Sequence, residues 1–147
     1  MDKIHTEAGS ESVYQKRLEE ARGWEKDGDS MRAEEGYRAL IAEYPEKFGV
    51  WWGYARFYME QQLAKEPSPP YREIELESNM LTKALEIADQ SQKLFIKQRI
   101  AEYKAAWEAK CEESRQNTRN ALQEFRSFKD FMKAFPAVYE SLRDVAD

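Results

Sequence analysis

The sequence predicts an all-α fold, and three observations lead to that prediction. Charged residues make up 35% of the 147-residue chain, which has only six glycines and five prolines, and this composition favours long amphipathic helices. Apolar residues recur in several segments at steps of three and four, the spacing of one helix face. Residues 48–60 (FGVWWGYARFYME) also have a near copy 34 residues upstream, and a period near this length is typical of stacked helix-turn-helix units.

The first repeated unit is predicted over residues 12–45, after a flexible leader at residues 1–11 that has no apolar face to dock. Ser12 is the expected cap of a first helix that runs to about residue 27, and Gly28 suits the left-handed conformation that ends a helix. Ser30 is expected to cap the second helix, and Pro45 terminates it because proline cannot continue the pattern. The two helices would form an antiparallel hairpin.

The second unit is predicted over residues 48–89. Its first helix covers residues 48–63, after which Pro67, Pro69 and Pro70 forbid helix and leave an extended loop. The second helix of this unit is predicted to resume near residue 71 and to run to about residue 88. The loop therefore expands the second unit relative to the first.

The remaining residues, 91–147, are predicted to form a degenerate, capping unit that begins with a long fifth helix. Its apolar stripe consists of Ile96, Ile100, Tyr103, Trp107 and Cys111. The polar run at residues 112–120 has little to bury, so the helix either projects into solvent or breaks there. Apolar spacing returns at residue 121 and is interrupted at Phe135 and Pro136, which predicts a C-terminal capping helix or a kinked pair of helices.

The chain resembles the tetratricopeptide repeat (TPR) family, in which small and aromatic residues of two helices pack together and a proline closes each unit. The first unit has the family's residues at Ala21, Trp24, Gly28, Ala33, Tyr37 and Pro45. The second unit keeps Trp51, Ala55 and Tyr58, and its VWWGYARFYME is also similar to the related half-a-TPR (HAT) repeat. The pattern is broken at Arg17, Glu20, Glu77 and Asp89. The resemblance implies a right-handed stack of antiparallel helix pairs, a TPR-like α-solenoid that forms one domain over residues 12–147.

Charge and cysteine content limit the classes of partner that we expect and the cellular compartment in which the protein would work. The 23 basic and 28 acidic residues give a net charge of −5, which disfavours general binding to nucleic acid or to anionic lipid. The one cysteine, Cys111, cannot make an internal disulfide, and no stretch approaches the ~20 apolar residues of a membrane span. Because the N-terminal residues also lack the apolar run of a signal sequence, we expect a cytoplasmic protein.

Catalysis is not expected from these residues. Acid–base and nucleophilic catalysis near neutral pH usually need a positioned histidine, and the only histidine, His5, lies in the leader. Cys111 shares the apolar stripe with Trp107, so we interpret it as a small apolar residue. The sequence has neither a glycine-rich phosphate loop nor a Cys/His cluster with metal-ligand spacing. We therefore expect no enzyme activity, no cofactor and no metal.

The TPR resemblance implies a concave groove, lined by the first helix of each unit, into which the residue after the small alanine points. The residues that would bind a partner there are Leu18, Arg22, Lys26, Trp52, Arg56 and Met59. The two arginines would hold carboxylates of the partner, and Trp52 would be an apolar anchor. The alternative is that the arginines pair with acids such as Glu19 or Glu60 and that Trp52 is core. The asparagine and lysine residues with which some family members clamp a chaperone tail are absent at these positions.

A second candidate surface lies in the C-terminal segment, where Phe125, Phe128, Phe131 and Phe135 cover a wide arc. Any of them that the stack does not bury would drive oligomerisation or docking of a partner. Our first expectation is a non-catalytic adaptor or scaffold that binds a peptide or partner helix, for which an acidic partner would suit the arginines. The alternatives are an oligomeric assembly subunit that uses the phenylalanines, and an RNA-associated helical-repeat factor, suggested by the HAT likeness and the basic residues between 91 and 126.

Overall fold

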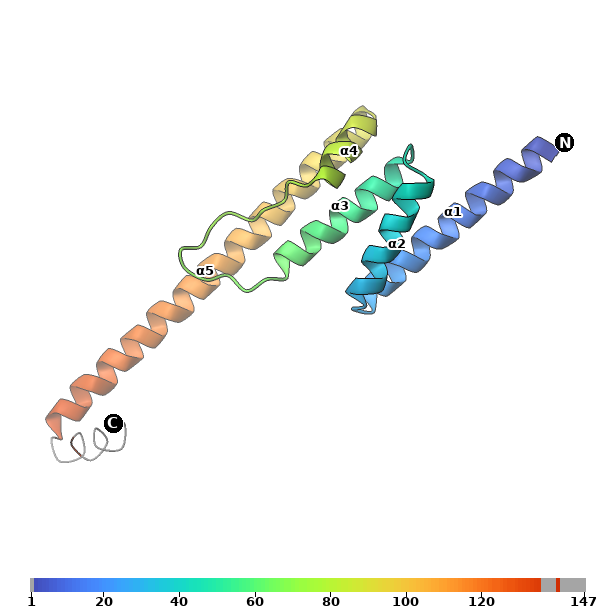
Figure 1. Cartoon of the computed structure of the whole chain (residues 1–147). Helices are drawn as coiled ribbons and strands as arrows, with labels where there is room; N and C mark the ends of the chain where they lie inside the picture. Colours follow the sequence, from blue (N-terminus) through green and yellow to red (C-terminus); the bar gives the residue numbers. More distant parts are fainter. Residues whose placement is uncertain (1, 136–139, 141–147) are drawn as a thin grey trace. The chain divides into compact units, whose positions relative to one another are not determined.

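The prediction of an all-α protein is confirmed by a computed structural model, which describes residues 2–135 and 140 and the side chains from Glu11 onward. These residues form five α-helices and no strand (Figure 1). The helices are α1 (Asp2–Lys26), α2 (Ser30–Glu43), α3 (Phe48–Leu63), α4 (Asn79–Ile87) and α5 (Gln90–Ala134).

The first helix begins ten residues earlier than the sequence predicts, at Asp2 rather than at Ser12. The backbone of residues 2–11, predicted as a leader outside the helix, is therefore helical, and Ser12 lies inside α1 instead of capping it. Extending a helix that has already formed fixes one residue for each new hydrogen bond, so this segment needs no apolar face of its own to be helical. Glu11 also forms an ion pair with Lys47, 3.0 Å away, at the start of α3.

Local motifs mark three of the other helix ends. Gly28 has the left-handed conformation predicted for it, with a φ of 82°. Asp29, and not the predicted Ser30, caps α2, because its carboxylate accepts a hydrogen bond from the Arg32 amide at 3.3 Å. Asp89 and Gln92 form a reciprocal capping box at the start of α5, with hydrogen bonds of 2.8 and 2.9 Å. The residue that departs from the TPR pattern at position 89 thus serves to start the next helix.

The fourth helix is shorter than predicted, since it begins at Asn79 and not near residue 71. Ser78 caps it by accepting a hydrogen bond from the Leu81 amide at 3.1 Å. The extended segment before it nevertheless contributes to the core, because Leu76 is buried and Ile74 packs against the same cluster. This segment follows the three prolines and extends the loop by eight residues beyond its predicted end.

Contacts between residues divide the chain into two compact units. The first comprises Met1–Lys65 with Glu73–Ala106, and the second comprises Glu66–Arg72 with Trp107–Asp147. In the first unit α1 packs against α2, α2 against α3 and α3 against α4. Helix α5 contributes residues to both units.

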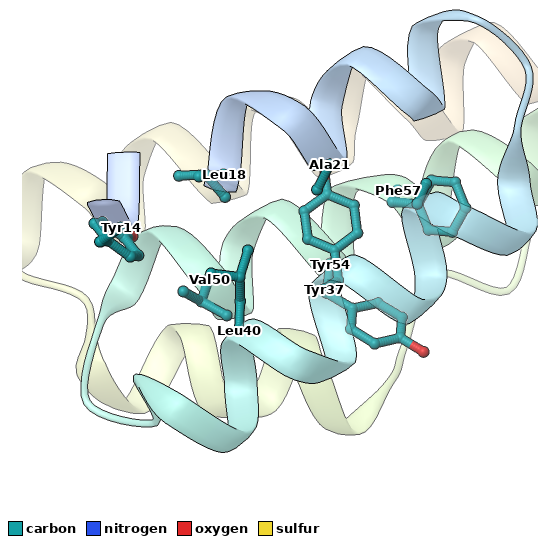
Figure 2. Close-up of a cluster of buried hydrophobic side chains, with 9 residues drawn as sticks. Tyr14, Leu18, Ala21, Tyr37, Leu40, Val50, Tyr54 and Phe57 are labelled. Atoms are coloured by element: carbon teal, nitrogen blue, oxygen red, sulfur yellow. The ribbon is translucent and has the colours of Figure 1, made fainter. Parts of the chain in front are cut away.

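Two apolar clusters form the core of the first unit. Figure 2 shows the first cluster, in which α1, α2 and α3 contribute Tyr14, Leu18, Ala21, Ala33, Tyr37, Leu40, Val50, Tyr54 and Phe57. Tyr37 is fully buried at its centre, and its ring lies 5.8 Å from that of Tyr54 and 5.7 Å from that of Phe57. The second cluster joins α3 to α4 and α5 through Trp52, Ala55, Met59, Leu76, Leu81, Ala84, Ala88, Ile96 and Tyr103.

Helix α5 is continuous for 45 residues, so the polar run at residues 112–120 does not break it. No glycine or proline interrupts this stretch, and ion pairs along the helix support the run, such as Arg115 with Glu108 at 3.0 Å and with Glu112 at 3.3 Å. Of the two predicted alternatives, a helix that projects or one that breaks at the polar run, the structure has the unbroken helix, and residues 121–134 continue α5. Whatever part of the predicted capping helix follows Phe135 lies outside the described residues, apart from Glu140.

Exchanging Gly28 for alanine should destabilise the fold by about 1 kcal/mol, because an L-residue is strained at this positive φ. Gly23 is the matched control, since a Cβ at either position meets nothing within 4 Å and Gly23 lies within the helical part of α1. Gly23→Ala should instead stabilise by about 0.5–1 kcal/mol. Urea unfolding of both variants measures the two effects, and an equal response would contradict the assignment of Gly28 as the helix stop.

Candidate partner-binding surfaces

The apolar residues predicted to line a groove are part of the core. Leu18 is only 4% exposed and belongs to the first cluster, whereas Trp52 (8%) and Met59 (0%) belong to the second. The Trp52 ring lies edge-on to that of Phe95, with the centroids 5.9 Å apart. A buried indole cannot insert into a pocket of another chain without opening its own cluster, so the structure corresponds to the alternative in which Trp52 is core.

Arg56 is engaged within the chain. Its guanidinium, on α3, forms an ion pair with the Glu25 carboxylate of α1 and donates a longer hydrogen bond to the Tyr37 hydroxyl at 3.5 Å. Both members of the pair are mostly buried, with 22% of the Arg56 side chain and 16% of the Glu25 side chain exposed. Burial alone would lower the pKa of Arg56, but the hydrogen bond and charge of Glu25 outweigh it and raise that pKa. The pair joins α1 to α3 beside the first cluster.

Arg22 and Lys26 lie in a different environment from Arg56, since both are exposed and neither has an ion pair within the described part of the chain. Arg22 and Arg56 therefore differ both in exposure and in ion pairing. Sequence reasoning missed Glu25, although a signal was present: the offset of 34 residues aligns Glu25 with Met59, a fully buried position. A carboxylate at a core position needs a cationic or hydrogen-bonding partner in the chain.

A second polar contact, between Tyr103 and Glu60, joins α5 to α3. The Tyr103 hydroxyl donates a hydrogen bond of 2.6 Å to the Glu60 carboxylate, and the Arg99 guanidinium lies 5.4 Å from the centre of the Tyr103 ring. Burial and, after it, the bond to Glu60 raise the pKa of Tyr103 to about 12. Glu60, which the sequence offered as a partner for an arginine, is thus held by a tyrosine. Like the Arg56 pair, this contact joins helices of the fold.

The C-terminal part of α5 and the residue that follows it present an exposed apolar surface, which we call the phenylalanine stripe. Its five residues are each at least half exposed: Leu122, Phe125, Phe128, Phe131 and Phe135. Every side chain from residue 116 to residue 131 is exposed, whereas Met132 is buried. The rings of Phe131 and Phe135 lie 4.9 Å apart, so they already contact each other. All four phenylalanines that the sequence singled out are therefore accessible.

The part of α5 that precedes the stripe is covered within the second unit by the segment Glu66–Arg72. The Trp107 indole donates a hydrogen bond of 2.9 Å to the Arg72 carbonyl, and the Tyr71 hydroxyl lies 3.2 Å from the Ser114 hydroxyl. The Arg115 guanidinium lies over the Tyr71 ring at 4.9 Å, and Cys111 is buried. Because this segment covers the apolar face only as far as Ser114, the phenylalanine stripe begins about two turns later, at Leu122.

Two kinds of feature are absent from the described residues. Among them, no group of three or more His, Cys, Asp or Glu side chains is arranged to hold a metal ion. No described helix has the length and apolar character that crossing a membrane requires. The Arg56–Glu25 pair and the Tyr103–Glu60 hydrogen bond, both partly buried, connect helices to one another. The large exposed apolar side chains of α5 and of the residue after it are those of the phenylalanine stripe together with Leu94 and Phe95. Comparisons with models of protein families, with curated proteins and with solved structures give no match for this chain.

Proposed function

We propose that this protein is a non-catalytic protein-protein interaction module whose docking surface is the phenylalanine stripe of α5. The observation that carries the proposal is the exposure of five large apolar side chains within 14 residues, four of them on α5 and the fifth, Phe135, directly after it. Fully burying such a side chain contributes roughly 1.5–3 kcal/mol, so covering even part of this surface would provide a substantial driving force for association. Contiguous exposed apolar surface of this kind marks interaction sites in soluble proteins.

The predicted groove has weaker support as the docking surface. Its apolar members, Leu18, Trp52 and Met59, are already buried, and the Arg56 charge is balanced by Glu25. Only Arg22 and Lys26 remain as exposed members of that set. Two exposed cations without an apolar anchor provide little affinity, because exposed ion pairs contribute at most about 1 kcal/mol each.

The proposal includes a TPR-like arrangement, in which α1 with α2 and α3 with α4 are successive antiparallel pairs and α5 starts a third unit. It is supported by the 34-residue offset and by the packing of α1 on α2, α2 on α3 and α3 on α4. We also place the protein in the cytoplasm, a setting that suits a chain with one cysteine and no possible internal disulfide. In this arrangement the repeats form the scaffold and α5 presents the stripe.

Site-specific photo-crosslinking in cells tests the docking surface. A photoreactive residue at Leu122 should form adducts with another protein chain, whereas the same residue at Gln123 should not, because Gln123 is also exposed but points about 100° away around the helix. The adducts at position 122 should disappear in a Phe125→Ser, Phe128→Ser variant whose helical circular dichroism is unchanged. Equal adducts at positions 122 and 123, or adducts that survive the double substitution, would refute the proposal.

A further inference from the structure

The two flanks of the phenylalanine stripe differ in charge. On one flank a basic ridge follows steps of seven, three and four residues along α5, formed by Arg119, Arg126, Lys129 and Lys133. Leu122 lies between Arg119 and Arg126 on the same line, so the ridge directly borders the apolar surface. The opposite flank carries Asn117, Asn120, Glu124 and Ser127, with one carboxylate among them.

Within the part of the chain that the structure describes, most of the charge on the ridge is unbalanced. Arg126, Lys129 and Lys133 are exposed and have no ion pair among the described residues, while Arg119 lies 3.5 Å from Glu112. Residues 119–135 contain four basic and two acidic residues, although the whole chain has a net charge of −5. A local positive field next to exposed phenylalanines selects for a negatively charged partner with an apolar face of its own.

A membrane surface fits this pattern poorly. Lipid lies on both sides of an interfacial helix, so anionic headgroups favour cations along both edges of the apolar face. Here the cations follow one edge only, and the net charge of −5 on the whole chain opposes approach to an anionic bilayer. A partner with two chemically different sides, such as a second helix, matches the asymmetry.

A second copy of the chain also fits poorly in either orientation. In a parallel pair the Glu66–Arg72 segments of both copies would meet, because Tyr71 already occupies the apolar face at Ser114. In an antiparallel pair each flank faces the same flank of the other copy, so the two basic ridges would lie side by side and repel each other. The surface therefore favours a different chain.

We propose that the stripe binds an amphipathic helix of another protein that carries a row of Asp or Glu beside its apolar face. The apolar face of that helix packs on Phe125, Phe128 and their neighbours, and its carboxylates lie along Arg126, Lys129 and Lys133. This proposal rests on the proposed function and adds the chemistry of the partner. The ridge determines which helix is accepted and in which orientation, and the stripe supplies most of the affinity.

Two synthetic helices test the charge preference on the full-length protein. Each has about 21 residues, or three heptads, with leucine at the core positions, and they differ only in having glutamate or lysine at every flanking position. Like charges along their flanks keep each peptide from pairing with itself. Fluorescence anisotropy should give a Kd at least about tenfold lower for the acidic helix, and this preference should shrink between about 50 and 200 mM salt.

Charge reversal at the ridge should invert the preference, so that an Arg126→Glu, Lys129→Glu, Lys133→Glu variant binds the basic helix more tightly. The matched control reverses three exposed lysines elsewhere on α5, Lys93, Lys97 and Lys104, which changes the net charge equally and should leave the preference for the acidic helix in place. If both triple variants respond alike, the ridge does not select the partner and the proposal is overturned.

The remaining outcomes separate this proposal from the one on which it rests. Equal binding of both helices, lost in the Phe125→Ser, Phe128→Ser variant, overturns the acidic preference but keeps the stripe as the docking surface. If neither helix binds, the acidic-helix proposal fails, and the crosslinks at Leu122 decide the docking surface independently. If the solution mass rises to that of a dimer as the protein concentration increases, the acidic-helix proposal is overturned in favour of a second copy. If phosphatidylserine vesicles bind more tightly than the acidic helix, it is overturned in favour of a membrane.

Discussion

Replacing Arg56 by alanine should lower the free energy of unfolding by about 2–4 kcal/mol, although arginine is usually a surface residue. Breaking a buried ion pair typically costs about 3–5 kcal/mol, because the remaining charge stays buried without a partner, and the partial exposure of this pair reduces the figure. The remaining charge here is the Glu25 carboxylate, whose Oε1 atom is buried and has no hydrogen-bond partner among the described residues even when Arg56 is present. Urea unfolding followed by circular dichroism measures the loss.

Arg22→Ala is the matched control, because the sequence assigns Arg22 and Arg56 the same position in successive units. Arg22 is exposed, so its removal should change the stability by no more than about 0.5 kcal/mol. A double variant, Glu25→Leu with Arg56→Met, should regain most of the loss, since apolar residues of similar size can replace a buried pair without leaving a charge behind. Equal effects of the two arginine substitutions would show that the Glu25 pair does not stabilise the fold.

The sequence determined most helix boundaries because local signals mark them. The predicted range 48–63 coincides with α3, and Gly28 and Pro45 correctly separate α1 from α2 and α2 from α3. The start of α4 is an exception, since the helix predicted from about residue 71 includes Ile74 and Leu76. They alternate with the exposed Glu73, Glu75 and Glu77, a two-residue period that indicates extended backbone, and the structure has no helix at these residues.

The candidate sites show what periodicity can and cannot predict. In α5, periodicity correctly grouped the buried Ile96, Tyr103 and Cys111 on one face, but periodicity does not reveal whether another element covers a face. The same kind of apolar spacing occurs at Ile96 and Tyr103, which α3 and α4 cover, and at Phe125 and Phe128, which are exposed. Because coverage depends on packing between distant segments, the groove residues could not be separated from core residues by sequence alone.

Replacing Trp52 by alanine tests this distinction between a core residue and an anchor. The side chain is 8% exposed, packs within the second cluster and contacts Phe95 edge-on. Truncation of a buried tryptophan leaves a large cavity, so the variant should lose about 3–5 kcal/mol of stability. Trp52→Phe, which keeps an aromatic ring in the cluster, should lose clearly less. Thermal and urea unfolding of the two variants provide the comparison.

Photo-crosslinking at Leu122 completes the test. Loss of an anchor residue would abolish partner binding, whereas loss of a core residue lowers the stability of the fold. The stripe lies on a different segment of the chain from Trp52, so a folded Trp52→Phe variant should form the same crosslinks at Leu122 as the wild type. If Trp52→Ala instead kept wild-type stability and lost the crosslinked partner, Trp52 would be the anchor that the TPR resemblance implies. In that case the groove, and not the phenylalanine stripe, would be the primary docking surface.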